Sequence, residues 1–164
     1  MSRIVVTGPD GSGKSLVAAA LAARLRARFV DGDDLHTRAN AAKMRGGRAL
    51  DDGERRQWLD AVSLVLARQA PVVVSSPPLR REYRDRLRGD TGDVWFAELV
   101  MPPASSRRKA SRRDRVVPTG LLDPHQDALT PLAVDEAGAR FAHDADLEWV
   151  VARIAAVREI QSLR

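Results

Sequence analysis

The chain has 164 residues, 44% of them hydrophobic and 30% charged, a composition typical of one globular domain and not of a disordered chain. No apolar run approaches the ~20 residues that a membrane-spanning helix needs, and the absence of cysteine excludes disulfides and thiolate metal sites. The net charge is +5 and the basic residues are almost all arginine, which holds phosphate and carboxylate groups well. The N-terminal residues do not show the positively charged and then apolar pattern of a secretory signal peptide, so we expect a cytoplasmic protein without a membrane partner.

The first predicted elements are a β-branched strand at 3–7, a glycine-rich turn and an alanine- and leucine-rich helix over 16–28. The turn has the form G-x-x-x-x-G-K-[ST] of a P-loop, and the residues expected to bind a nucleotide are Gly8, Pro9, Asp10, Gly11, Ser12, Gly13, Lys14 and Ser15. In such a loop backbone N–H groups surround the phosphates, Lys14 reaches the β- and γ-phosphates, and the Ser15 hydroxyl binds Mg²⁺. A plain turn with a solvated lysine is the alternative, but the order strand, loop, helix favours a site for ATP and Mg²⁺.

Strands and helices continue to alternate along the rest of the chain. The predicted strands are 29–31, 71–75, 94–100 and 139–142. The predicted helices are 36–45, one capped by Asp51 or Asp52, one entered at Pro77–Pro78 and continuing through Leu87, then 103–112 and 147–163. Strands separated by helices pair in parallel through right-handed crossovers, which predicts a single α/β domain over 1–164 of the P-loop NTPase type. Ligands of such sheets bind beyond the carboxyl ends of the strands.

Asp31 and Asp33 stand at the end of the second predicted strand, and therefore at the same edge of the sheet as the P-loop. One carboxylate there can order water bound to Mg²⁺, and the other can accept the proton of an attacking hydroxyl. The alternative is a D-G-D turn whose aspartates cap the next helix. The adjacent phosphate loop favours phosphoryl transfer, and no lone aspartate follows the strand at 72–74, which suits small-molecule kinases.

The densest positive charge lies at 107–115, for which three interpretations compete. It could be a solvated helix face, a patch for nucleic acid, or a lid over about 107–127 whose arginines close over ATP. The aromatic content of 4% leaves few residues to stack on bases, which argues against nucleic acid. Arg108 and Arg112 are four residues apart and share one helical face, so we expect Arg108 to contact ATP and Arg112 to stabilise the transferred charge.

Four segments resemble the motifs of gluconate kinases. Residues 31–44 read D-G-D-D-L-H-T-R-A-N-A-A-K-M, close to the family pattern D-G-D-x-L-H-P-x-x-N-x-x-K-M. Residues 47–59 resemble its G-x-P-L-x-D-x-D-R-x-P-W-L, residues 79–88 its L-K-x-x-Y-R-D-x-L-R, and residues 118–126 its P-x-x-L-L-x-S-Q. With the P-loop, the resemblance runs from about Ile4 to the final helix.

The resemblance implies a gluconokinase that transfers the γ-phosphate of ATP to the 6-hydroxyl of D-gluconate. It implies that Lys14, Asp33 and Arg112 are catalytic and that Ser15 and Asp31 hold the metal. The residues that it places on the side of the sugar acid are Asp33, His36, Arg55, Arg80, Arg84 and Gln126. Since the resembling enzymes are often dimers, a homodimer is a further expectation.

Simpler roles compete with two of these assignments. Arg84 could pair with Asp85 or Glu54 on the surface, and His36 could cap its helix. The chain also departs from the family pattern, with Ser76-Pro77-Pro78-Leu79 in place of C-S-A-L, Arg80 in place of lysine, 114–118 in place of G-H-F-M-P, and Thr37 in place of proline. These departures fall on the acceptor and lid sides, so a kinase of another small hydroxylated acid and a nucleotide-binding module without efficient kinase activity are the alternative functions.

Overall fold

The computed structural model describes residues 2–100, 130–142 and 146–162 of the chain. Its elements, in chain order, are β1 (Arg3–Thr7), α1 (Lys14–Leu25), β2 (Arg28–Asp31), the 3₁₀ helix η1 (Gly32–Leu35), α2 (Arg38–Arg45), α3 (Asp52–Arg68), β3 (Val72–Ser76), α4 (Arg81–Thr91), β4 (Trp95–Val100), β5 (Gly138–Ala142) and α6 (Leu147–Ser162). The helix predicted at 103–112 lies outside the described residues. The remaining predicted strands and helices are all present, with shifted ends.

The five strands form one sheet in the order β2-β3-β1-β4-β5, and every neighbouring pair is parallel. Ile4 of the central strand β1 is opposite Val73 on one side and Trp95 on the other. This confirms the predicted parallel α/β sheet. All five strands therefore end at the same edge, where β1 leads into the P-loop and β2 into η1.

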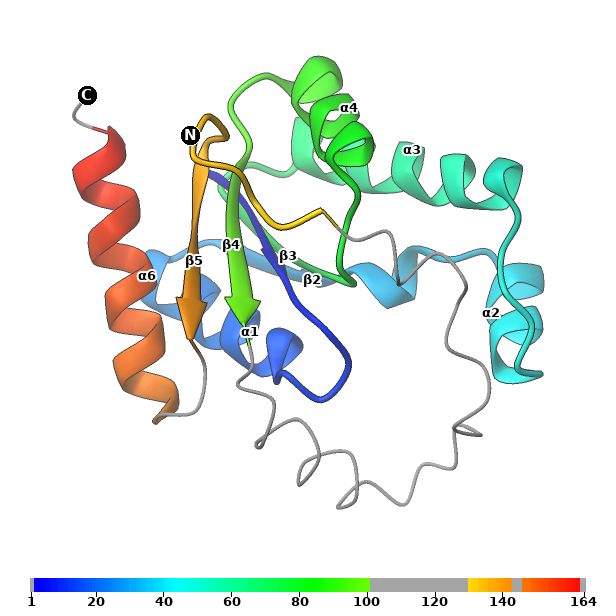
Figure 1. Cartoon of the computed structure of the whole chain (residues 1–164), viewed down its shortest axis with the longest axis horizontal. Helices are drawn as coiled ribbons and strands as arrows, with labels where there is room; N and C mark the ends of the chain where they lie inside the picture. The colour runs from blue at the N-terminus through cyan, green and yellow to red at the C-terminus, as the bar shows by residue number, and fades with distance from the viewer. Residues whose placement is uncertain (1, 101–129, 143–145, 163–164) are drawn as a thin grey trace.

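Helices cover both faces of the sheet (Figure 1). On one face α1 and α6 bury a core that includes Ile4 and Val6, and on the other α3 and α4 bury a second core that includes Val5. Because successive side chains of a strand point to opposite faces, the β-branched run of β1 serves both cores at once. The sheet is thus fixed from both sides, and its loops at the carboxyl edge have a rigid base.

Local capping decides where α2 and α3 begin. After Asp31 the chain forms η1, and α2 begins only at Arg38, because Thr37 Oγ1 accepts from Asn40 N–H at 3.1 Å. The helix cap is therefore Thr37 and not His36, so the prediction of a helix from residue 36 and the capping role for His36 are both wrong. For α3 the cap is Asp51, which forms a capping box with Glu54.

The segment between β3 and α4 also differs from the prediction. Helix α4 begins at Arg81, after Arg80 in an extended conformation, and not at Pro77–Pro78. A residue before proline is held away from helical dihedrals, so the Pro-Pro pair keeps this stretch extended. The result is a loop that leaves β3 at the carboxyl edge of the sheet and lies beside the P-loop strand, where Thr7 Oγ1 donates to Pro77 O at 2.8 Å.

Candidate active site

The P-loop connects β1 to α1, and its glycines are required by its shape. Gly11 and Gly13 have φ angles of 80° and 77°, in the left-handed region that side chains rarely adopt. A Cβ on Gly8 would come within 2.8 Å of Ser12 Oγ and 3.1 Å of Leu99 O. Since Gly13 caps α1 without a side-chain hydrogen bond, the first N–H groups of the helix face the loop. These groups form a cradle for an anion.

Polar side chains of the loop fit a polyphosphate. Lys14 Nζ lies 3.1 Å from Asp10 Oδ1; the lysine side chain is 13% exposed and the aspartate 86%. Such an exposed partner holds the lysine weakly, which leaves its charge available to a phosphate. The Ser12 hydroxyl is buried and has no hydrogen-bond partner among the described residues. Ser15 lies in the first turn of α1, beside the same N–H groups.

The acid pair at the end of β2 has two distinct members. Asp31 Oδ1 accepts hydrogen bonds from Asp33 N–H at 3.1 Å and from Ser75 Oγ of β3 at 2.9 Å. Asp31 therefore caps η1, as the turn interpretation predicts, and also ties β2 to β3. Its carboxylate still has lone pairs for a further ligand.

Asp33 is exposed to solvent, yet neighbouring residues partly desolvate its carboxyl group. Partial burial raises the pKa of Asp33 above its ordinary value, and the negative charge of Asp31 raises it further. Lys14 and His36 oppose this shift of the pKa, although they do not cancel it. Asp33 is thus electrostatically coupled to the P-loop lysine, and a carboxyl with a raised pKa in such a site suits proton acceptance from a hydroxyl.

His36 packs against α3. Its ring stacks on Trp58 with centroids 5.3 Å apart and planes 15° apart, and Trp58 Nε1 donates to Gly32 O at 2.7 Å. Burial lowers the pKa of His36, Asp33 raises it, and the positive charge of Arg55 lowers it again. The net direction is down, so the imidazole is neutral at pH 7 and able to hydrogen-bond a hydroxyl in either sense.

Two polar groups near η1 and α2 are buried without partners among the described residues, namely His36 Nδ1 and Asn40 Nδ2. Buried polar atoms without partners are rare, and in a crevice they are candidates for contacts with a ligand. Neither Asn40 nor Trp58 is among the site residues predicted from the sequence. Both lie in the motif segments at 31–44 and 47–59, which were the signal that could have identified them.

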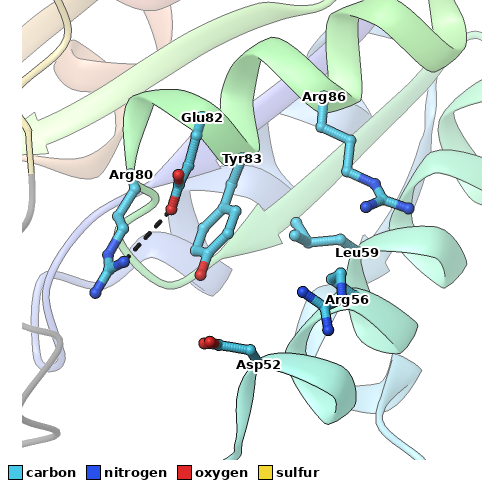
Figure 2. A pocket seen from close by; sticks show the side chains of 7 residues that line it. All are labelled: Asp52, Arg56, Leu59, Arg80, Glu82, Tyr83 and Arg86. Carbon is cyan, nitrogen blue, oxygen red and sulfur yellow. Dashed lines mark hydrogen bonds and ion pairs between the residues drawn. The ribbon is translucent and has the colours of Figure 1, made fainter.

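Arg80 lines a pocket of about 600 Å³ between α3 and α4 (Figure 2). Its Nη1 lies 3.4 Å from Glu82 Oε1, and its guanidinium carbon lies 6.0 Å from the centre of the Tyr83 ring. The lining residues are Asp52, Arg56, Leu59, Arg80, Glu82, Tyr83 and Arg86. Three arginines against two carboxylates leave this pocket with a positive balance that suits an acidic molecule.

A second cavity, of about 270 Å³, adjoins the P-loop itself. Its walls come from the end of β1, the loop after β3, the end of β4 and the segment at 130–131. The lining residues are Thr7, Gly8, Pro9, Pro78, Leu79, Glu98, Leu99, Val100, Thr130 and Pro131. This cavity lies at the carboxyl edge of the sheet, where ligands of such folds bind.

Comparisons with known proteins show which family this chain belongs to. The AAA domain family matches residues 4–132. Over 156 residues the chain is 35% identical to the thermoresistant gluconokinase of Escherichia coli (strain K12), covering 90% of this chain and 88% of that protein. The chain belongs to the gluconokinase family. The predicted resemblance is confirmed, and with it the expectation of a P-loop kinase.

Solved structures agree with the gluconokinase assignment. A gluconokinase from Sinorhizobium meliloti 1021 superposes with a TM-score of 0.85 at 33% identity, covering 99% of this chain and 96% of that one. Shikimate kinase from Aquifex aeolicus vf5 superposes with a TM-score of 0.64 at 18% identity, covering 98% of each chain, which shows a shared fold. The fold class predicted from the alternation of elements is therefore confirmed.

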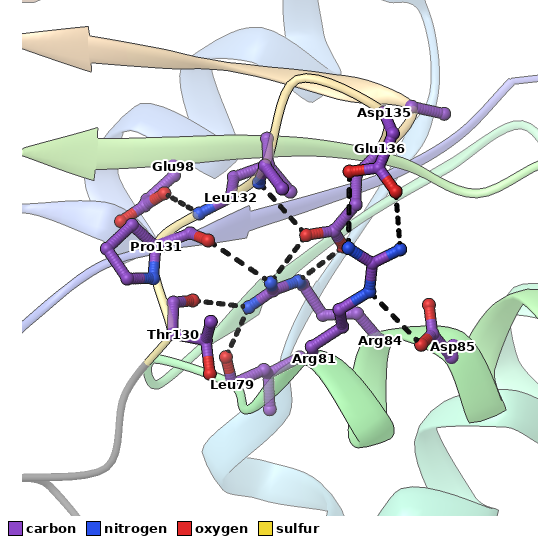
Figure 3. Close-up of polar contacts among 12 residues, drawn as sticks. Leu79, Arg81, Arg84, Asp85, Glu98, Thr130, Pro131, Leu132, Asp135 and Glu136 are labelled. Atoms are coloured by element: carbon purple, nitrogen blue, oxygen red, sulfur yellow. Dashed lines mark hydrogen bonds and ion pairs between the residues drawn. The ribbon is translucent and has the colours of Figure 1, made fainter.

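One acceptor-side prediction for this gluconokinase family member is corrected by the structure. Arg84 is 3% exposed and directs its guanidinium into the protein (Figure 3). All five of its N–H groups are used, by both oxygens of Glu136 and by the carbonyls of Leu79, Thr130 and Pro131. No donor remains for a substrate, so the expected contact between Arg84 and the sugar acid is wrong.

The surface alternative for Arg84 is wrong as well. Asp85 pairs with Arg81 and Arg88, and Glu54 pairs with Lys43 of α2. The carboxylate that pairs with Arg84 is Glu136, which lies 52 residues further along the chain.

The predicted lid at about 107–127 lies outside the described residues. With it lie Arg108, Arg112 and Gln126, so their roles stay predictions. The structure brings together Lys14, Asp31, Asp33, His36 and Arg55, and it puts Arg80 at the start of α4.

The protein groups fit Mg²⁺ only as part of a nucleotide complex. Within the described ranges no three His, Cys, Asp or Glu residues are grouped to hold a metal ion. Mg²⁺ usually keeps several waters and binds one or two protein groups together with the phosphates of the substrate. Ser15 and Asp31 could be those protein groups.

Among the described residues, no helix is both long and apolar enough to cross a membrane.

Proposed function

We propose that this chain is a gluconokinase that transfers the γ-phosphate of ATP to the 6-hydroxyl of D-gluconate, giving ADP and 6-phospho-D-gluconate. The observation that supports this most directly is the position of Asp33, in η1 directly after β2, at the same edge of the parallel sheet as Lys14 of the P-loop. A carboxylate and a phosphate-binding lysine at one edge of the sheet are what transfer from a nucleotide to a hydroxyl requires. The curated relative from E. coli carries the gluconokinase name.

On the donor side, the N–H groups of the P-loop and of the first turn of α1 bind the phosphates of ATP. Lys14 exchanges its exposed partner Asp10 for the β- and γ-phosphates. Ser15 and Asp31 would hold Mg²⁺, which would supply positive charge to offset the negative charge that develops on the phosphates during transfer.

On the acceptor side, the 6-hydroxyl oxygen attacks the γ-phosphorus, and the bond from that phosphorus to the bridging oxygen of ADP breaks. Asp33 orients the hydroxyl and takes its proton. His36, neutral and backed by Trp58, hydrogen-bonds another hydroxyl of the acid. Arg55 and Arg80 attract its carboxylate, since a guanidinium binds a carboxylate through two parallel hydrogen bonds.

The proposal includes a lid over about 107–127 in one kinase domain. Arg108 contacts ATP, Arg112 stabilises the charge on the transferred group, and Gln126 contacts the acid. Positioning and electrostatics supply the catalysis, as in other phosphoryl transfers.

A kinase of another small hydroxylated acid is the second candidate, and a specific observation favours it. Pro78 and Leu79 line the cavity beside the P-loop together with Pro9, Leu99 and Pro131, which makes that wall largely apolar. Pro77 and Pro78 offer no backbone N–H to a substrate hydroxyl. An acid with fewer hydroxyl groups than gluconate would suit such a wall.

A coupled assay of ATP turnover with gluconate and a panel of other sugar acids tests the proposal. The highest kcat/KM with gluconate supports a gluconokinase, and turnover of another acid alone supports the second candidate. ATP binding without turnover of any acid, together with an Asp33→Asn variant that behaves as wild type, would reduce the chain to a nucleotide-binding module.

A further inference from the structure

Arg84 joins two stretches of backbone that line the cavity beside the P-loop (Figure 3). Its Nη1 donates both to Leu79 O, in the loop after β3, and to Thr130 O at 2.9 Å. Its Nη2 donates to Pro131 O at 3.5 Å. One guanidinium thus holds residues from two of the walls that enclose this cavity.

Glu136 fixes the position of that guanidinium. Its Oε1 accepts from Arg84 Nε at 2.8 Å and its Oε2 from Arg84 Nη2 at 2.6 Å, in a bidentate pair whose side chains are 1% and 3% exposed. Arg88 Nη1 donates to Oε1 at 3.0 Å, and Ala133 N–H donates to Oε2 at 3.0 Å. Two hydrogen bonds to this carboxylate hold the plane of the Arg84 guanidinium, and the bonds from Arg88 and Ala133 hold the carboxylate, so the remaining N–H groups of Arg84 are aimed at the two walls.

Stability alone gives a weak reason for such an arrangement. A buried ion pair often contributes no more to folding than well-packed apolar side chains of similar volume. What apolar side chains cannot do is bind carbonyl groups from two separate segments in one plane. The neighbouring contacts serve the same walls, since Thr7 Oγ1 holds Pro77 O and Glu98 Oε2 accepts from Leu132 N–H at 2.7 Å.

We propose that Arg84 is a positioning residue for phosphoryl transfer, which sets the spacing of the cavity walls at Leu79 and Thr130 and so the place of the acceptor against the P-loop. This inference rests on the proposed function. Arg84 touches neither nucleotide nor acceptor. It acts through the backbone that the acceptor meets.

The test compares Arg84→Lys with a matched control, Arg81→Lys, on the same helix. A lysine at 84 keeps the charge opposite Glu136 but cannot reach both carbonyls with a planar fork. We expect the KM for the acceptor acid to rise about tenfold and kcat to fall as well, since a misplacement near 1 Å can cost up to about 10²-fold in rate. The Kd for an ATP analogue should stay within about twofold, because the P-loop does not contact Arg84.

The control acts on a surface ion pair, since Arg81 pairs with exposed Asp135. Arg81→Lys should therefore leave the acceptor KM, kcat and the Kd of the ATP analogue unchanged.

A merely structural role would give a different pattern. If Arg84→Lys lowers Tm and weakens nucleotide and acceptor binding in proportion, or leaves the acceptor KM unchanged in a folded protein, the inference is overturned. Should Arg84→Lys fail to fold, Glu136→Gln takes its place. This variant keeps all five N–H groups of Arg84 and removes the carboxylate charge of Glu136 that orients them. The same rise in acceptor KM without loss of nucleotide affinity is then expected, and its absence counts against the inference.

Hydrogen exchange separates this inference from the proposed function. If wild type phosphorylates no sugar acid, the proposed function fails. The inference is then judged by exchange at residues 130–137 and in the first turn of α4. Faster exchange there in Arg84→Lys, with unchanged exchange in α1, supports the wall contacts, whereas unchanged exchange overturns them.

Discussion

Two titratable residues of the site have pKa values that shift in opposite directions. Burial and the charge of Asp31 raise the pKa of Asp33, and burial lowers the pKa of His36. The largest cause of both pKa shifts is the same, since partial burial disfavours the charged form of each group. An acid whose proton is held more tightly, beside a neutral imidazole, is an arrangement suited to general base catalysis.

Replacement of Asp33 by asparagine should remove the acid limb of the pH profile. In wild type we expect kcat/KM to rise with pH as Asp33 loses its proton, with an apparent pKa above 3.8 because the pKa of Asp33 is raised. Asp33→Asn should lower kcat by roughly 10²–10⁴-fold and flatten that limb. The measurement is kcat/KM from pH 4 to 8. A limb that disappears in His36→Gln and survives in Asp33→Asn would assign the titration to His36.

The same substitution makes a prediction about stability. A folded-state pKa raised above the unfolded value means that ionised Asp33 weakens the fold at neutral pH. Asp33→Asn should therefore have a slightly higher Tm than wild type at pH 7, and the gap should close as the pH falls below 3.8, where Asp33 is protonated in both states. Equal Tm values at both pH values would contradict the raised pKa.

Lys14→Ala should lower the rate of transfer strongly and leave the fold intact. The lysine contributes charge to the phosphate cradle, and its ion-pair partner among the described residues is the exposed Asp10. Loss of such an electrostatic contact typically costs roughly 10²–10³-fold in kcat. Steady-state kinetics measure the loss and thermal unfolding checks the fold. Asp10→Asn, which removes the same ion pair and keeps the lysine, is the control and should retain most activity.

At the scale of elements, helix ends position the residues proposed to bind the acceptor acid. Asp51 caps α3 through a capping box with Glu54, and Glu54 in turn holds Lys43 of α2 at 2.6 Å. The pKa of Asp51 is lowered, chiefly by the hydrogen bond from Glu54 N–H, as expected for a charged cap. This capping box therefore links the start of α3, which carries Arg55 and Trp58, to α2.

Removal of the cap should loosen this link. We expect Asp51→Ala to lower Tm by roughly 2–4 °C, because one N–H group of the first turn loses its acceptor. The KM for the acceptor acid should rise as well, since Arg55 and the Trp58 support of His36 lie within the first two turns of α3. Thermal unfolding and steady-state kinetics measure both effects. Gln57→Ala, an exposed change in the same turn, should alter neither.

At the scale of the whole molecule, Arg84 and Glu136 join α4 to the segment that leads into β5. The hydrogen bonds of Arg84 to Thr130, Pro131 and Glu136 span 46 to 52 residues of sequence. Burial raises the pKa of Glu136, but hydrogen bonds from Arg84, Ala133 N–H and Arg88 outweigh it and lower the pKa to about 2. The pair therefore remains charged throughout the pH range in which the protein would function.

Glu136→Gln should cost about 3 kcal/mol of unfolding free energy at pH 7, because it leaves Arg84 buried without a countercharge. Since the folded-state pKa lies below the unfolded one, the stability from Glu136 is full above pH 4.5 and is lost as the pH falls towards 2. Urea unfolding between pH 2.5 and 7 measures this, and the difference between variant and wild type should shrink on acidification. A constant difference would show that the charge of Glu136 is not what stabilises the fold.

The sequence by itself determined the phosphate loop and the order of strands and helices, although it misplaced the starts of α2 and α4. The spacing of Gly8, Gly13 and Lys14 identifies a P-loop, because eight consecutive residues make the phosphate cradle. Alternating β-branched runs and helical stretches predicted the parallel sheet, and the sheet predicted that Asp33 would lie beside Lys14, since all parallel strands end at one edge.

The tertiary structure decided what depends on packing between distant segments. Arg80, Arg84 and Arg88 recur at intervals of four along α4, so the sequence offers no reason to treat them differently. Packing of the helix over the sheet buries Arg84, leaves Arg80 at the edge of a pocket, and brings Glu136 to Arg84 from 52 residues away. A buried arginine needs a partner for every N–H, and only the folded chain shows that its partners are a carboxylate and the backbone, and not a substrate.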